Sequence, residues 1–294
     1  MKIVVAIDSS ESSEIVVNEV ALRPWPQGTE VCVLTVLDLF SFPTGFSGIG
    51  PLVDVDLPAA EALVSKAVEH FASRGLEAST AVTEGYPQSS IVEYAEQGNA
   101  DFIIVGSHGH SGITRFLLGS VAQDVVRRAR CSVEIVRAAK GKSQKEGMRI
   151  LLATDGSDSS IAAARSIAAR PWPEGSEVKV ICAVQTSAPV VEPGQVATEA
   201  DQIRENMVKR SEEDVTVSEK IIADAGLSVV GAVLTGRPKE TILDEAQQWG
   251  ADLIVVGSHG RRGITRLFMG SVSEAVARHA HCSVDVIRQQ PQLS

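Results

Sequence analysis

Two stretches of the sequence hold the residues best suited to chemistry, and both are glycine-punctuated loops between an apolar run and a helix pattern. The first has the spacing Gly-x2-Gly-x9-Gly-Ser and contains Gly106, His108, Gly109, Gly119 and Ser120. Glycines allow the backbone to approach a ligand closely. The first N–H groups of a helix have no partner within the helix and therefore attract anions. The stretch is predicted to hold phosphate groups.

The second stretch repeats this spacing and contains Gly257, His259, Gly260, Gly270 and Ser271. The rest of the chain is duplicated as well, since the segment Arg-Pro-Trp-Pro occurs at residues 23–26 and again at residues 170–173. A polar, glycine-containing segment at residues 138–147 is typical of a linker. We therefore expect two tandem domains of similar fold, at residues 1–138 and 147–290.

The order of strand and helix patterns determines the expected fold. In the first half, β-branched apolar runs predict strands at residues 2–7, 30–37, 76–83, 101–105 and 132–136, with helix patterns between them. Such alternation is typical of parallel sheets with right-handed crossovers. We predict an α/β fold in which each domain is a doubly wound, five-stranded parallel sheet of the flavodoxin-like type, with strand order 3-2-1-4-5.

An aspartate follows the first expected strand of each half, at Asp8 and Asp155. In a doubly wound sheet the ligand lies beyond the carboxyl ends of the strands, where the winding reverses. With the expected order, that crevice lies between the first and fourth strands and places each aspartate opposite a glycine loop. A carboxylate can accept hydrogen bonds from a ribose or a base while the loop holds phosphates, so a nucleotide is the expected ligand.

Composition excludes several other classes of partner. The net charge of −10 at pH 7 argues against nucleic acid and against an anionic membrane surface. No apolar run reaches the roughly 18 residues of a membrane-spanning helix, and Asp8 comes too early for a signal peptide. We expect a cytoplasmic protein. The four cysteines form no C-x-x-C pair and are interpreted as buried, reduced thiols.

With the glycine spacing present twice and an aspartate after each first strand, nearly the whole chain resembles a tandem pair of universal stress protein domains. The resemblance implies an adenine nucleotide alpha hydrolase-like fold with ATP in each domain, and Mg²⁺ as a further candidate ligand. Asp8 and Asp155 would contact the ribose or adenine, backbone at Val36 and Val184 would contact adenine, and the glycine loops would hold the phosphates. It also implies that the fifth strands pair within the chain as an internal pseudo-dimer; a homodimer of chains is left open.

One departure separates the two halves. The family commonly has Asp-Gly-Ser after the first strand, as at residues 155–157, whereas the first half has Asp8-Ser9-Ser10. Gly156 is expected to leave room for the ligand and Ser9 to crowd it. Arg261 and Arg262 add positive charge to the second loop. We therefore expect the second domain to bind nucleotide more tightly.

An enzyme is the main alternative. Each loop has an adjacent Ser-His pair, at residues 107–108 and 258–259, but adjacent side chains on an extended segment are expected to point apart. No G-x-S-x-G elbow surrounds them. Phosphoryl transfer needs a base and a metal-binding carboxylate near the phosphates, and only Asp8 or Asp155 is apparent. We expect a nucleotide-dependent stress-response regulator or sensor, not a metabolic enzyme. Slow ATP hydrolysis and an interaction protein with vestigial sites are the alternatives left open.

Overall fold

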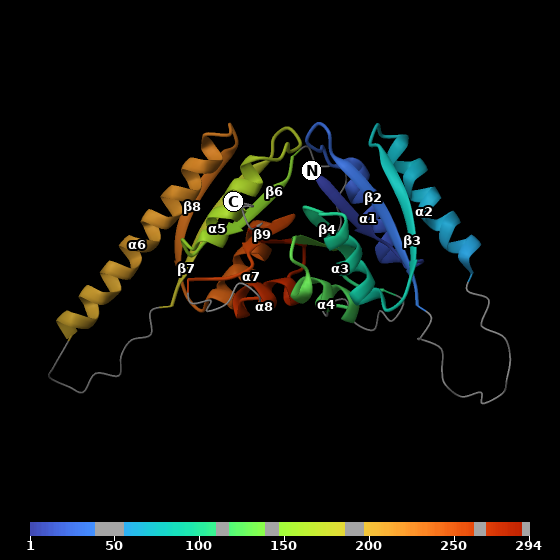
Figure 1. Cartoon of the computed structure of the whole chain (residues 1–294). Helices are drawn as coiled ribbons and strands as arrows, with labels where there is room; N and C mark the ends of the chain where they lie inside the picture. Colours follow the sequence, from blue (N-terminus) through green and yellow to red (C-terminus); the bar gives the residue numbers. More distant parts are fainter. Residues whose placement is uncertain (39–55, 110–117, 139–146, 186–196, 262–268, 290–294) are drawn as a thin grey trace, which may run out of the picture. The chain divides into compact units, whose positions relative to one another are not determined.

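The computed structural model describes residues 1–38, 56–109, 118–138, 147–185, 197–261 and 269–289 (Figure 1). The chain divides into two compact units, Met1–Ala138 and Ala139–Pro291. Within these ranges, no helix has the length and apolar character needed to cross a bilayer.

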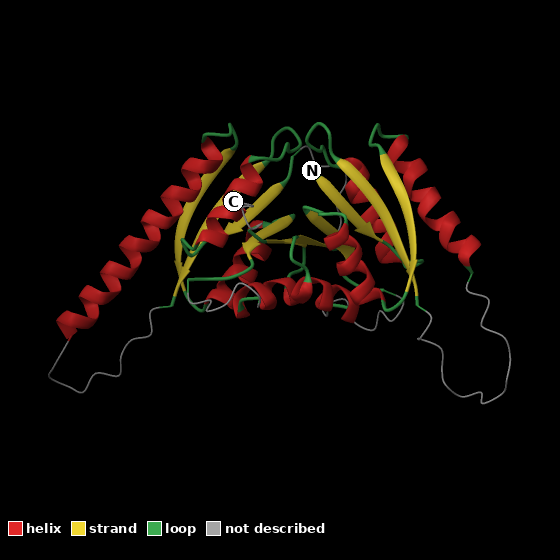
Figure 2. Ribbon diagram, viewed as in Figure 1, coloured by secondary structure: helices red, strands yellow, loops and turns green. Residues whose placement is uncertain are grey.

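The first unit alternates strands and helices in the predicted order (Figure 2). Its elements are β1 (Lys2–Ala6), α1 (Glu11–Leu22), β2 (Glu30–Leu37), α2 (Leu57–Ala72), β3 (Ala78–Glu84), α3 (Pro87–Gln97), β4 (Phe102–Gly106), α4 (Ser120–Arg128) and β5 (Ser132–Val136). The strands are parallel and lie in the order β3-β2-β1-β4-β5. The predicted fold class and strand order are confirmed for this unit.

The winding direction places the helices on two faces. α1 contacts α2, and α3 contacts α4, so the two pairs cover opposite faces of the sheet. Central strand residues are therefore buried from both sides, and Val5, Ile104 and Val133 have no exposed surface. Burial of each such side chain contributes about 1.5–3 kcal/mol to folding. This explains why the central strands read as continuous apolar runs rather than as an alternating pattern.

The second unit repeats the architecture with the strand order β8-β7-β6-β9-β10. Its elements are β6 (Arg149–Ala153), α5 (Asp158–Ala168), β7 (Glu177–Val184), α6 (Ala197–Ala223), β8 (Ser228–Thr235), α7 (Pro238–Trp249), β9 (Leu253–Gly257), α8 (Ser271–His279) and β10 (Ser283–Ile287). The described part of α6 is longer than α2. Pairing of β5 with β10 as an internal pseudo-dimer stays a prediction.

A buried ion pair ties the turn after the first helix of each unit to that unit's last strand. Arg23 donates from both terminal nitrogens to Glu134 on β5, at 2.6 Å each. In the second unit, the Arg170 guanidinium lies 2.6 Å from Asp285 on β10. The side chains of both pairs are at most 5% exposed. The repeated Arg-Pro-Trp-Pro segment is thus a structural motif, in which the arginine also lies near the following indole ring.

This arrangement predicts that Arg170→Met destabilises the protein by about 3–5 kcal/mol, because the buried Asp285 carboxylate would lose the Arg170 guanidinium that lies 2.6 Å from it. Urea unfolding measures the loss. Arg165→Met, at an exposed position of α5, is the matched control and should change stability by less than about 0.5 kcal/mol. The double variant Arg170→Met/Asp285→Leu should recover most of the loss, since both members of the ion pair are then replaced by apolar side chains. Equal stability of the two single variants would contradict the assignment.

Candidate functional site

The candidate site of each unit lies where the strand order reverses. β1 pairs with both β2 and β4, and Ala6 lies opposite Val105 in the register. Asp8 follows β1 and Gly106 ends β4, so the two meet at the same edge of the sheet. In the second unit Ala153 lies opposite Val256, which brings Asp155 and Gly257 together in the same way.

In the first unit this edge encloses a cavity of about 270 Å³. Seven of the eight residues predicted for this unit line it: Asp8, Val36, Gly106, His108, Gly109, Gly119 and Ser120. The remaining one, Ser9, is not among the lining residues. Pro87 and Ile91 at the start of α3 add an apolar wall that the sequence did not predict.

Asp8 is held in place by the start of α1. Its Oδ1 accepts hydrogen bonds from the Ser10 backbone N–H at 3.0 Å and the Ser13 hydroxyl at 2.7 Å, as well as from the Ser10 hydroxyl. The Asp8 N–H in turn donates to Ser13 Oγ at 2.8 Å. These contacts fix the carboxylate before any ligand arrives.

The glycine loop approaches this carboxylate so closely that a larger residue does not fit. A Cβ atom on Gly109 would lie 2.9 Å from Asp8 Oδ2, and one on Gly260 would lie 2.7 Å from Asp155 Oδ2. Such separations are shorter than an ordinary van der Waals contact. A side chain at either position would therefore have to displace the carboxylate that faces it.

The helix that follows each loop begins without a side-chain cap. Gly119 is the N-cap residue of α4 and Gly270 that of α8, and a glycine has no side chain to accept from the first N–H groups. The Gly119 N–H donates to Ser107 O at 2.8 Å, which fixes the direction of the helix start. The first turn of α4 contains no acidic residue, whereas that of α8 contains Glu274. An anion is therefore favoured more at α4 than at α8.

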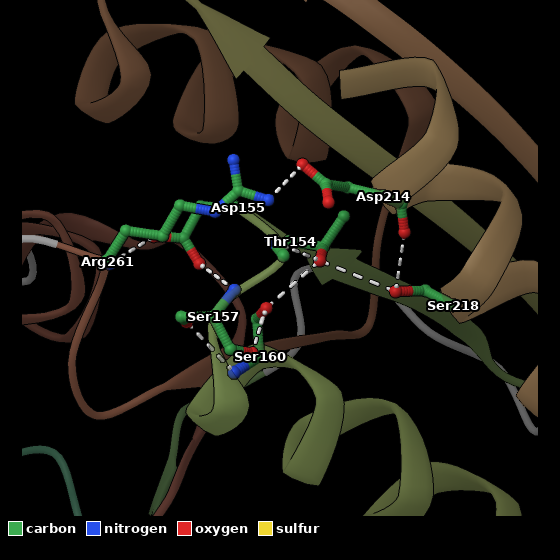
Figure 3. Close-up of polar contacts among 8 residues, drawn as sticks. Thr154, Asp155, Ser157, Ser160, Asp214, Ser218 and Arg261 are labelled. Carbon is green, nitrogen blue, oxygen red and sulfur yellow. Dashed lines mark hydrogen bonds and ion pairs between the residues drawn. The ribbon is translucent and has the colours of Figure 1, made fainter. Parts of the chain in front are cut away.

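The corresponding edge of the second unit is covered by its own arginine (Figure 3). The Arg261 N–H donates to Asp155 Oδ2 at 3.0 Å, and its guanidinium forms an ion pair with Asp214 on α6. A Cβ atom on Gly156 would collide with both the guanidinium and the Asp214 carboxylate. Gly156, whose φ is +69°, thus leaves room for this ion pair. The neighbouring Arg262 lies outside the described residues.

A chain of hydroxyl groups lies behind this ion pair. The Ser218 hydroxyl donates to the Asp214 carbonyl at 3.1 Å and lies 3.4 Å from Thr154 Oγ1 (Figure 3). Thr154 Oγ1 also lies 3.1 Å from Ser160 Oγ and accepts from the Gly156 N–H at 3.2 Å. This polar cluster of α5, α6 and the end of β6 was not predicted from the sequence.

The first unit has apolar side chains in most of these places. The turns at Gly75 and Gly226 and the β2–β3 and β7–β8 registers align the two units. In this alignment Leu63 takes the place of Asp214 and Ala67 that of Ser218. His110, the counterpart of Arg261, lies outside the described residues. The two candidate sites therefore differ in chemistry although their loops have the same spacing.

Two details differ from the sequence interpretation. Val36 and Val184 are not equivalent, because Val184 pairs with Thr235 as Leu37 pairs with Glu84; the counterpart of Val36 is Ala183. The expectation that each adjacent Ser-His pair points apart is wrong. A hydrogen bond joins Ser107 Oγ to His108 Nδ1 at 2.9 Å, and the second unit has the same contact at 2.7 Å.

The two serines of these contacts are largely buried. Ser107 is 5% exposed and borders the cavity beside Asp8, and Ser258 is 1% exposed. The contact orients the imidazole rings at the loop. Among the described residues, no group of three or more His, Cys, Asp or Glu side chains could hold a metal ion.

Comparison with known proteins identifies relatives of this chain. The model of the universal stress protein family matches residues 1–137 and 148–288. A universal stress protein of Mycobacterium tuberculosis is 30% identical over 234 residues, which span 74% of this chain and 71% of the relative. One from Mycolicibacterium smegmatis is 25% identical over 298 residues, spanning 97% of this chain and 96% of the relative.

A solved structure shows the same fold. The crystal structure of a universal stress protein from Archaeoglobus fulgidus DSM 4304 covers 98% of this chain and 96% of its own, with a TM-score of 0.67 and 23% sequence identity. At this identity the likeness shows the fold and nothing beyond it.

The first glycine of each loop yields a stability prediction. A Cβ on Gly257 would lie 2.6 Å from the backbone carbonyl carbon of Ser159, whereas a Cβ on Gly106 would lie 2.5 Å from the Ser12 hydroxyl oxygen. Because a hydroxyl can be removed and a backbone cannot, Gly257→Ala should cost about 1–3 kcal/mol that Ser159→Ala does not restore. The cost of Gly106→Ala should fall when Ser12→Ala is added.

Double-mutant cycles measured by urea unfolding test this difference. The expected result is a favourable coupling of Gly106→Ala with Ser12→Ala and a smaller coupling of Gly257→Ala with Ser159→Ala. Equal couplings in the two cycles would show that the loops are not packed as described.

Proposed function

Because the chain belongs to the universal stress protein family, we propose that its first unit binds an adenine nucleotide, with ATP as the favoured ligand. The observation that carries the proposal is the cavity beside Asp8, which brings the predicted nucleoside and phosphate contacts of the first unit to one place. The loop glycines leave the backbone exposed to a ligand, and the uncapped start of α4 offers N–H groups to an anion.

The ligand's orientation follows from the positions of these groups. The phosphates would lie at Gly106, Gly109 and the N-terminus of α4, where backbone N–H groups and the helix dipole stabilise negative charge. The ribose or adenine would lie toward Asp8, whose Oδ2 faces the loop, and toward Val36 near the end of β2. Pro87 and Ile91 would cover an apolar face of the base.

A Mg²⁺ ion accompanying ATP would be held chiefly by the phosphate oxygens and water, as is usual for this ion. Asp8 would lie at the nucleoside end, where it accepts hydroxyl or amino donors. Among the described residues that line the cavity, Asp8 is the only carboxylate, so no second carboxylate lies at the phosphate end to hold a metal for phosphoryl transfer. We therefore favour a nucleotide-dependent regulator or sensor of the stress response over an enzyme with efficient turnover.

The second unit is proposed to bind the nucleotide less tightly than the first, the reverse of the order that the sequence suggested. A ligand at Asp155 and Gly156 has to displace Arg261 from Asp214. The ion pair is partly exposed, with Arg261 33% and Asp214 15% accessible, so displacing it costs up to about 1 kcal/mol. Glu274 in the first turn of α8 adds repulsion toward phosphates.

Isothermal titration with ATP tests the site and its asymmetry. Asp8→Asn should weaken the tighter binding event by roughly tenfold to a hundredfold, because a charged hydrogen-bond acceptor is lost while the bonds from Ser10 and Ser13 can still form. Asp155→Asn is the matched control in the other unit and should leave this event unchanged. Loss of the tighter event with Asp155→Asn would reverse the proposed order, and no binding by the wild-type chain would refute the function.

A third variant isolates the ion pair. Asp214→Leu gives the second unit the residue that the first unit has in this place. It should strengthen the weaker binding event by about twofold to fivefold, because the nucleotide no longer competes with Asp214 for Arg261. Leu63→Asp in the first unit is the reciprocal change and, since His110 replaces Arg261 there, should not strengthen binding. A weaker second event with Asp214→Leu would contradict the competition.

A further inference from the structure

A second cavity lies at the opposite edge of the first unit's sheet. Its volume is about 370 Å³, and Lys2, Glu30, Cys32, Ser79, Tyr94 and Gly98 border it. Lys2 and Glu30 begin β1 and β2, and Gly98 follows the end of α3, so this cavity is at the amino ends of the strands. The candidate nucleotide site is at the carboxyl ends. Small-molecule pockets commonly have volumes of about 300–1,000 Å³.

The second unit has a half-buried tryptophan at the corresponding position of its sequence. α3 begins at Pro87 and α7 at Pro238, and counting from these prolines places Trp249 where the first unit has Gly98. The residues that follow, Asn99 and Gly250, both have positive φ, at 50° and 71°. The two helices therefore end in the same register, and the first unit lacks the indole that the second unit has.

Two cationic side chains lie near the Trp249 ring. The Arg149 guanidinium carbon lies 6.0 Å and the Lys179 ammonium nitrogen 5.8 Å from the centroid of the ring. Both are at cation–π distance. Arg149 also donates to the Trp249 carbonyl at 3.0 Å, and Lys179 forms an ion pair with Glu245. An aromatic ring is thus held by two cations at the amino ends of β6 and β7.

The first unit has one cation at these positions and, in place of the Lys179–Glu245 ion pair, a thiol and a phenol. Lys2 takes the place of Arg149, while Cys32 and Tyr94 take those of Lys179 and Glu245. Cys32 Sγ lies 3.2 Å from Tyr94 Oη. This hydrogen bond, together with burial, raises the pKa of Tyr94 to about 12. A sulfur atom and a phenol ring are favourable neighbours for an aromatic ligand.

We propose that this cavity binds a free planar aromatic molecule of indole size, in the place that the Trp249 side chain takes in the second unit. Lys2, Cys32 and Tyr94 all border the cavity, so a cation, a thiol and a phenol ring are available to a bound aromatic ring. The site is separate from the nucleotide site, and its occupancy does not depend on that function.

Indole is the probe, and the Cys32 thiol reports its binding. Cys32 is half-buried, while Cys131, Cys182 and Cys282 are buried and provide internal references. Iodoacetamide labelling of the folded wild-type chain, followed by mass spectrometry of the Cys32 peptide, should slow about tenfold when indole is present at ten times its dissociation constant. An unchanged labelling rate up to the solubility limit of indole would overturn the proposal.

Two substitutions at one position separate binding from an indirect effect on the thiol. Gly98 has φ −77° and ψ −5°, and a Cβ there lies 3.4 Å from the nearest atom, so larger residues are tolerated. Gly98→Trp should close the cavity, slow Cys32 labelling without indole and abolish the response to indole. Gly98→Ala should retain the response. Circular dichroism verifies that both variants are folded, and an indole response that survives in folded Gly98→Trp would also overturn the proposal.

A substitution in the second unit provides an independent test, in which a new indole site should be created. Trp249→Gly removes the indole side chain between Arg149 and Lys179 and leaves a matching space. Saturation of this variant with indole, measured by isothermal titration, should give one more bound molecule than the wild-type chain. The same stoichiometry in both chains would show that the place of Trp249 does not accept a free ring.

Discussion

The close approach of an aspartate to a glycine loop is the constraint on which each candidate site depends. It arises because β1 and β4, or β6 and β9, are neighbours in a sheet whose winding reverses between them. Asp8 and Asp155 therefore face Gly109 and Gly260 so closely that a Cβ atom on either glycine would touch the carboxylate. The uncapped helix after each loop adds an anion-binding end to the same edge. In each unit, the strand order therefore brings the candidate binding groups together at one aspartate–glycine pair.

Duplication of this frame has allowed the two units to diverge in chemistry. In the second unit the Arg261–Asp214 ion pair covers the edge that stays open beside Asp8 in the first. At the other end of the sheet the second unit has Trp249, near Lys179, at the position where the first unit has Gly98 beside a cavity. In the second unit, the Arg261–Asp214 ion pair and the Trp249 indole are parts of the chain. In the first unit, we propose that bound ligands lie at the two corresponding places. We infer that the first unit is the main binding unit of the pair.

Much of the fold could be predicted from the sequence. Buried parallel strands and amphipathic helices have distinct hydrophobic patterns, and the same order of patterns occurs in both halves of the chain. The meeting of Asp8 with Gly109 followed from the strand order and one motif. The Arg261–Asp214 ion pair could not be predicted in this way. The motif identifies the residues of the loop, but it does not say where side chains on a distant helix point. Aligning the halves would have revealed it, since a charged residue replaces Leu63 on an inward-facing stretch of helix.

The measurement that most directly tests nucleotide binding at the first unit is the number of ATP molecules bound per chain, by equilibrium dialysis against labelled ATP. Because the cavity beside Asp8 is open while Arg261 covers the edge at Asp155, ATP should bind in two overlapping steps, the first molecule at a lower concentration than the second. No bound ATP at millimolar concentration would contradict the proposed function. Two molecules bound with equal affinity would show that the Arg261–Asp214 pair does not obstruct the second site.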